Sequence, residues 1–174
     1  MEKRTLKKME QPKKLSRPSY SDDSEMEDEK MESMEYKVGV MKRTPEMQKV
    51  DKMTSALVQE LMNAATSFHR LHLRVTGEGS FAQHKALNEI YDALPDLADT
   101  IAEGYQGACE VILSYTTQAP IDLPDVESAI EYMREIKDKV NQLQAVMPHT
   151  EIINELDNTK LAIDSAKYKL IFLA

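Results

Sequence analysis

Apolar residues recur at steps of three and four along most of this chain, from about Met53 onward, and this period restricts the fold more than any other feature. Such spacing places the apolar side chains on one face of an α-helix. The period is interrupted at residues 76–79, at residues 116–124, which hold two prolines, and at Pro148. Four amphipathic helices are therefore predicted. A chain with five glycines and no tryptophan also suits an all-α body.

Local signals indicate where each helix begins. Four residues with side chains suited to helix N-caps precede the periodic segments: Thr44, Ser80, Asp125 and Thr150. Pro45 suits the first turn of the first helix. Pro95 falls inside the second helix, where a proline removes a hydrogen bond, so we expect a bend there.

The connections between the predicted helices are short, long and short. The middle one is long enough to cross the length of a bundle. Four helices joined in this way are typical of a ferritin-like four-helix bundle with one long crossover. We expect this bundle to occupy residues 46–174 and to follow a charged N-terminal extension over residues 1–45.

Charge is distributed unevenly in the first 45 residues. The first 20 residues contain seven basic side chains: Lys3, Arg4, Lys7, Lys8, Lys13, Lys14 and Arg17. Residues 21–35 contain eight acids and one lysine. Few apolar residues and opposite charge blocks predict a tail that is disordered, or ordered only by a partner. The basic block could contact DNA phosphates, or the tail could dock on another protein.

Composition excludes several other classes of protein. No run of 18 apolar residues is present, so we expect no membrane span, and no apolar segment follows the first charges as in a signal peptide. The single cysteine, Cys109, excludes an intrachain disulfide and suits a reducing compartment such as the bacterial cytoplasm. From residue 51 onward there are 19 acids and 10 basic residues, a balance that attracts cations and repels nucleic acid.

Metal-ligand side chains are concentrated between residues 68 and 107. His72 closes the first predicted helix, and His84 lies about one turn into the second. Asn88 follows His84 by four residues, so the two share a helical face. Asp99 and Glu103 form another pair four residues apart. Imidazole and carboxylate groups together suit ferrous iron or another divalent metal.

Distance limits how these side chains could share a metal ion. His84 and Asp99 are 15 residues apart, which is about 22 Å along a helix at 1.5 Å per residue. Ligand atoms lie within about 2–2.5 Å of an ion. One chain therefore cannot bring both residues to one metal. Two chains can, if their second helices run antiparallel across a two-fold axis, and such a homodimer holds two identical sites.

The segments HLRVTGEGSFAQHKALN and DTIAE resemble the pattern HWxxxGxxFxxxHxxxDx10DxxxE of the Dps (DNA protection during starvation) proteins, which belong to the ferritin superfamily. Five positions match in place: His72, Gly77, His84, Asp99 and Glu103. Phe81 lies one residue after the phenylalanine of the pattern. The resemblance implies that both histidines and both carboxylates are iron ligands at a subunit interface. It also implies a hollow cage, oxidation of Fe²⁺ to Fe³⁺ by peroxide, mineral storage and, in some members, DNA binding by a lysine-rich tail.

Two further positions depart from the pattern. Leu73 replaces the tryptophan, and Asn88, a neutral and weaker ligand, replaces a carboxylate. Glu89 is a poor substitute because it points about 100° away around the helix. Asn88 therefore predicts a weakened ferroxidase.

Dps-like proteins with divergent cores are also encoded by bacteriophages. The alternative function is thus a non-catalytic structural or interaction protein, for example a phage virion component that docks through its N-terminal tail. In that case we expect the chain in the virion or the host cytoplasm.

Overall fold

Four helices account for most of residues 42–174, the part of the chain that the computed structural model describes. They are α1 (Pro45–His72), α2 (Ser80–Cys109), α3 (Val126–Gln144) and α4 (Thr150–Phe172). Residues 42–174 thus form an all-α four-helix domain, as the apolar period predicts. The predicted tail lies outside the described residues except for residues 42–45. All seven basic residues of its first 20 positions lie outside them.

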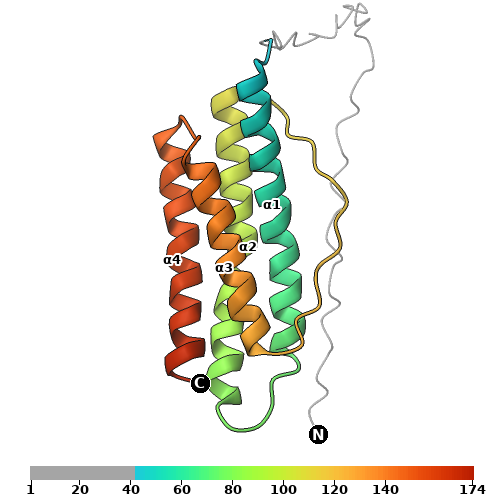
Figure 1. Ribbon diagram of the computed structural model, residues 1–174, viewed down its shortest axis with the longest axis vertical. Helices are drawn as coiled ribbons and strands as arrows, with labels where there is room; N and C mark the ends of the chain where they lie inside the picture. Colours follow the sequence, from blue (N-terminus) through green and yellow to red (C-terminus); the bar gives the residue numbers. More distant parts are fainter. Residues whose placement is uncertain (1–41) are drawn as a thin grey trace, which may run out of the picture. The chain divides into compact units, whose positions relative to one another are not determined.

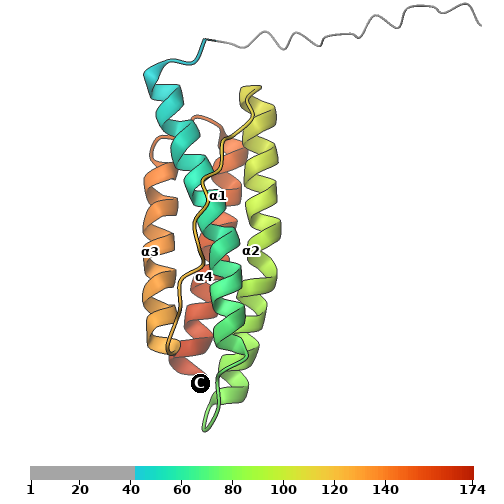
Figure 2. The same cartoon turned by 90° about the vertical axis from the view of Figure 1, so that its right-hand side faces the viewer.

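The helices pack side by side with their long axes roughly aligned (Figure 1). The main contacts join α1 to α2, α2 to α4, α4 to α3 and α3 to α1. The connection from α2 to α3 returns along the length of the bundle beside α1 (Figure 2). Because of this return, each of the four contacting pairs is antiparallel.

Side-chain caps begin α1 and α3. The Thr44 hydroxyl accepts a hydrogen bond from the backbone N–H of Met47 at 3.3 Å. Asp125 accepts from the N–H of Ser128 at 2.8 Å, and the Ser128 hydroxyl accepts from the N–H of Asp125 at 3.2 Å. This capping box satisfies donors that the first helical turn leaves free. The predicted N-cap roles of Thr44 and Asp125 are therefore confirmed.

Ser80 and Thr150 differ from the prediction because each is the first residue of its helix rather than the cap. The residues before them, Gly79 and His149, occupy the cap positions without a side-chain hydrogen bond. Gly79 has φ 75° and Gly77 has φ 90°, values that glycine adopts without a steric penalty. The glycines rather than a side-chain cap therefore shape the α1–α2 turn.

The core is formed where the apolar stripes of the four helices face one another. Phe68 of α1 is fully buried and its ring centroid lies 5.6 Å from that of Tyr132 on α3. The stripe of α2 continues through Pro95, and the helix is unbroken there. Pro95 therefore does not break the helix, and the bend expected there stays a prediction.

The apolar period around α2 extends beyond its buried face at both ends. Phe81 is 77% exposed and Ile112 is 86% exposed. The helix ends at Cys109 because Glu110 takes a left-handed conformation, with φ 49°. Within residues 42–174, no helix is long and apolar enough to cross a membrane.

Candidate metal centre

The turn between α1 and α2 brings His72 and His84 together. His72 is the last residue of α1, and His84 lies in the second turn of α2. Their imidazole rings stack with centroids 3.6 Å apart and an angle of 25° between the ring planes. His72 is 6% exposed, whereas His84 lies on the surface. The structure thus places the two histidines of the predicted site in contact.

Each of these two rings is held by the backbone of the other residue. Nδ1 of His72 lies 2.9 Å from the carbonyl oxygen of His84, and Nδ1 of His84 lies 3.2 Å from the carbonyl oxygen of His72. A carbonyl can only accept, so each Nδ1 is the protonated nitrogen that donates. In the neutral ring, Nε2 is then the nitrogen that carries the free lone pair. A histidine that donates from one nitrogen to a carbonyl and offers the other is the usual form of a metal ligand.

Two further aromatic residues, His69 and Tyr91, surround the pair. The His69 ring stacks on the Tyr91 ring at a centroid distance of 4.2 Å, and Tyr91 meets the edge of His72 at 5.1 Å. Sequence reasoning assigned neither residue to the site. The signal was available, because His69 precedes His72 by three residues and therefore shares its helical face.

Asn88, the predicted weak ligand, makes hydrogen bonds on its own helix. Its amide nitrogen donates to Asp92, and its oxygen accepts from the Tyr91 hydroxyl at 3.2 Å. Glu89, the neighbouring carboxylate, pairs with Lys169 of α4. Glu89 is therefore committed to a contact between helices, in agreement with its expected direction.

Asp99 and Glu103 lie further along the same unbroken helix, and both are exposed. Because α2 is continuous from Ser80 to Cys109, the separation of about 22 Å between His84 and Asp99 along the helix axis applies. Burial and then the negative charge of Asp99 raise the pKa of Tyr115. The structure brings the histidines together and leaves the carboxylates apart from them.

Over residues 42–174, no three His, Cys, Asp or Glu side chains gather closely enough to hold a metal within one chain. The two histidines are a partial donor set, and the two exposed carboxylates are another.

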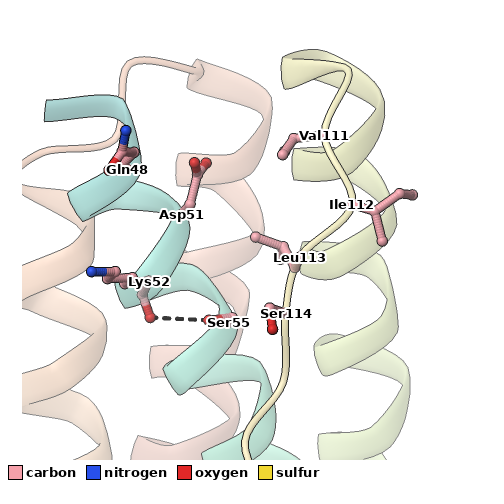
Figure 3. A pocket seen from close by; sticks show the side chains of 8 residues that line it. All are labelled: Gln48, Asp51, Lys52, Ser55, Val111, Ile112, Leu113 and Ser114. Atoms are coloured by element: carbon pink, nitrogen blue, oxygen red, sulfur yellow. Dashed lines mark hydrogen bonds between the residues drawn. The ribbon is translucent and has the colours of Figure 1, made fainter. Parts of the chain in front are cut away.

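A cavity of about 210 Å³ lies at the opposite end of the bundle, between the start of α1 and the residues after α2 (Figure 3). Its lining residues are Gln48, Asp51, Lys52, Ser55, Val111, Ile112, Leu113 and Ser114. Burial acts to raise the pKa of Asp51, but hydrogen bonds from Arg43 and Tyr105 outweigh it and hold that pKa below its usual value. Asp51 is therefore an ionised partner of Arg43 and not a free ligand.

Comparison with known proteins gives a family and no function. No curated protein and no solved structure matches the chain. A family of unknown function, DUF5856, matches residues 72–170. The matched segment contains both histidines, Asn88 and both exposed carboxylates. The chain therefore belongs to the DUF5856 family.

Proposed function

We propose that this protein is a Dps-like member of the ferritin superfamily that binds Fe²⁺ at a site shared by two subunits, oxidises it and sequesters it. The observation that carries the proposal is the reciprocal anchoring of His72 and His84, which leaves both Nε2 atoms available. Two imidazoles prepared in this way and two carboxylates form a donor set that suits ferrous iron. Another divalent metal with the same preferences is a competing substrate for the site.

The second half of the donor set is proposed to come from a second copy of the chain. Asp99 and Glu103 are exposed, so they are free to reach across an interface. Leu73 is 72% exposed and follows His72 directly, and Phe81 is 77% exposed and precedes His84 by three residues. Large apolar side chains in such positions favour burial against a partner. An antiparallel two-fold pairing of α2 helices meets both requirements and makes two equal sites.

The helix order supports the ferritin-like part of the proposal. The lengthwise connection between α2 and α3 gives the antiparallel neighbours that a bundle with one crossover requires. A cage assembled from such dimers is the larger assembly that we propose. Its acidic bodies would concentrate cations near the sites.

In the proposed reaction iron is the substrate. Two Fe²⁺ ions each give one electron to hydrogen peroxide, which takes up two protons and yields two water molecules and two Fe³⁺ ions. His72 and His84 bind through neutral nitrogens, while Asp99 and Glu103 supply negative charge that stabilises the ferric product more than the ferrous substrate. Asn88 supplies no charge, so turnover is expected to be slower than with a carboxylate there.

The test is to add Fe²⁺ and peroxide to the purified protein and follow ferric absorbance. We expect the wild type to exceed buffer, and His84→Ala and Asp99→Asn to fall to the buffer rate. Asp96→Asn is the matched control, because Asp96 is an exposed carboxylate of the same helix outside the donor set. A wild type that behaves like buffer would rule out the ferroxidase. Light scattering on the same sample distinguishes a dimer from a cage.

Asn88 favours one alternative, a structural or interaction protein without turnover, for example in a phage virion. Its amide is engaged by Tyr91 and Asp92 rather than left open toward a metal. Stable assembly together with iron oxidation at the buffer rate would support this alternative.

DNA binding by the basic tail is a separate proposal, based on the sequence alone. It predicts binding that weakens steeply with salt and disappears when residues 1–20 are removed.

A further inference from the structure

A second group of reactive side chains lies at the end of α2 that is remote from the histidine pair. Cys109 is the last residue of α2 and is partly buried. Its Sγ atom lies 3.3 Å from Nε2 of His149, the residue that immediately precedes α4. The two residues are 40 positions apart, so only the packing of α4 beside α2 brings them together.

The imidazole of His149 is placed between a nucleophile and a carboxylate. Its other nitrogen, Nδ1, lies 3.8 Å from Oε1 of Glu151. This carboxylate favours the tautomer in which Nδ1 carries the ring proton. Nε2 is then the nitrogen that can accept the thiol proton. A thiol beside a base that is itself oriented by a third group is the arrangement of activated cysteines.

Arg43 and Tyr105 add polar groups to the surroundings of Cys109. Arg43 donates to the backbone carbonyl of Cys109 at 3.4 Å and lies 3.4 Å from the Tyr105 hydroxyl. Burial, the hydrogen bond to Asp51 and the nearby Cys109 thiol raise the pKa of the Tyr105 phenol well above its usual range. Tyr105 therefore stays a neutral hydroxyl, and Arg43 brings a positive charge to the backbone of Cys109.

Solvent reaches this group through a cavity of about 200 Å³. Its lining includes Arg43, Val50, Tyr105, Cys109, Pro148 and His149. Pockets for drug-sized ligands usually start at about 300 Å³, so this one suits a much smaller molecule.

We propose that Cys109 is a reactive thiol that hydrogen peroxide oxidises to a sulfenic acid, with His149 as the base. His149 takes the thiol proton, and the thiolate sulfur attacks one peroxide oxygen. A sulfur–oxygen bond forms, the oxygen–oxygen bond breaks, and the departing hydroxide receives a proton from His149. The sulfur is oxidised and the peroxide reduced, so thiol and peroxide become sulfenic acid and water.

The fate of the sulfenic acid follows from composition. The chain has one cysteine, so no intrachain thiol can react with the oxidised sulfur. A small-molecule thiol that enters the cavity can displace water from the sulfenic acid and form a mixed disulfide. The site would thus act as a peroxide-responsive modification site, independent of the iron chemistry proposed above.

The test uses the full chain after treatment with a chelator, hydrogen peroxide as oxidant and dimedone to trap sulfenic acid, with intact-mass detection. The same thiol in urea is the reference for an unactivated cysteine. We expect the folded protein to be labelled at least about tenfold faster than the unfolded chain. This is less than the rate increase of about a hundredfold or more that a positioned general base usually supplies. Folded labelling no faster than unfolded labelling would overturn the proposal.

Variants locate the base. His149→Gln is expected to lower the folded rate to near the urea rate, and Glu151→Gln to lower it less. Glu155→Gln is the control, because Glu155 lies one turn further along α4 and outside the group. Thermal melts establish that each variant folds. If His149→Gln does not fold, Glu151→Gln still tests the proposal. A wild-type rate in both variants would refute the role of His149.

Two further measurements separate the steps. Addition of 2-mercaptoethanol after peroxide should give a protein with the mass of one added thiol. A disulfide between two Cys109 residues, seen on a non-reducing gel, would instead overturn the small-thiol step. His84→Ala should oxidise at Cys109 like the wild type, so failure of the iron proposal and failure of this one can be told apart.

Discussion

The two ends of α2 hold their functional side chains in different ways. At the turn end, His72 and His84 are anchored by backbone carbonyl oxygens. At the other end, Asp51 connects Arg43 to Tyr105, and Cys109 contacts His149, almost entirely through side chains. A backbone anchor fixes a tautomer but supplies no charge. A network of side chains supplies charge, and it depends on every member being present.

The largest expected effect tests whether the histidine end is complete in one chain. His84→Ala and Asp99→Asn, each alone, should oxidise iron no faster than buffer. Co-expressed in equal amounts, they should recover about one quarter of wild-type activity, since half of the random dimers are mixed and each mixed dimer keeps one intact site of two. Ferric absorbance measures this recovery.

No recovery in mixed dimers that native mass spectrometry shows to have formed would contradict a site shared between chains. A mixture of His84→Ala and His72→Ala serves as control. Both changes fall on the same half of the donor set, so that mixture should stay inactive.

The next effect tests the charge network at the thiol end. Asp51→Asn leaves Arg43 without its ionic partner, and the two side chains are only 17% and 12% exposed. We expect a loss of about 2 kcal/mol in the free energy of unfolding. Urea denaturation at pH 7 measures it.

The same variant tests the sign of the pH dependence. The folded-state pKa of Asp51 lies below its ordinary value of 3.8. Its contribution to stability is therefore complete above that value and is lost as the pH falls through the folded-state pKa. The stability difference between wild type and Asp51→Asn should shrink below about pH 4. A difference that is constant down to pH 2 would show that the ion pair is not its source.

A smaller, favourable effect is expected at the histidine end. Asn88→Asp restores a charged oxygen ligand one turn after His84, and we expect iron to bind about tenfold more tightly. Without metal the new carboxylate faces Asp92, which now accepts a hydrogen bond from Asn88, so the metal-free protein should melt slightly lower. Calorimetric titration with Fe²⁺ under anaerobic conditions measures the affinity. Unchanged affinity would place Asn88 outside the metal site.

The smallest effect separates His69 from the pair. Its ring rests on Tyr91, and no carbonyl anchors its nitrogen among the hydrogen bonds of the described residues. We therefore expect His69→Gln to change the rate of iron oxidation by less than about threefold. His69 packs on Tyr91, which in turn contacts His72, so His69 acts on the proposed ligand only indirectly. A loss as large as that of His84→Ala would make His69 a ligand.

Much of the fold could be predicted because helical period and breakers are local properties. Met53 to Phe68 repeat at helical steps whatever the rest of the chain does, and glycines at 77 and 79 end a helix by their own conformational preference. The failures occurred at helix ends. Phe81 and Ile112 continue the apolar period, yet no neighbouring helix covers them, and they stay exposed.

The candidate metal site could be predicted in part for the same reason. The spacing of His72 and His84 around a short turn predicts proximity, whereas the stacking of their rings and the hydrogen bonds to the carbonyl oxygens depend on the packing of α1 on α2. His69 could have been included from its spacing alone.

The sequence by itself determined four amphipathic helices, the glycine turn between α1 and α2, and the distance along α2 that separates His84 from Asp99. These features follow from the geometry of one helix and one turn. The tertiary structure decided which histidine nitrogens are free, and it brought Cys109 to His149. Those contacts join residues whose separation in sequence carries no periodic signal, so only the packing of whole helices against one another could establish them.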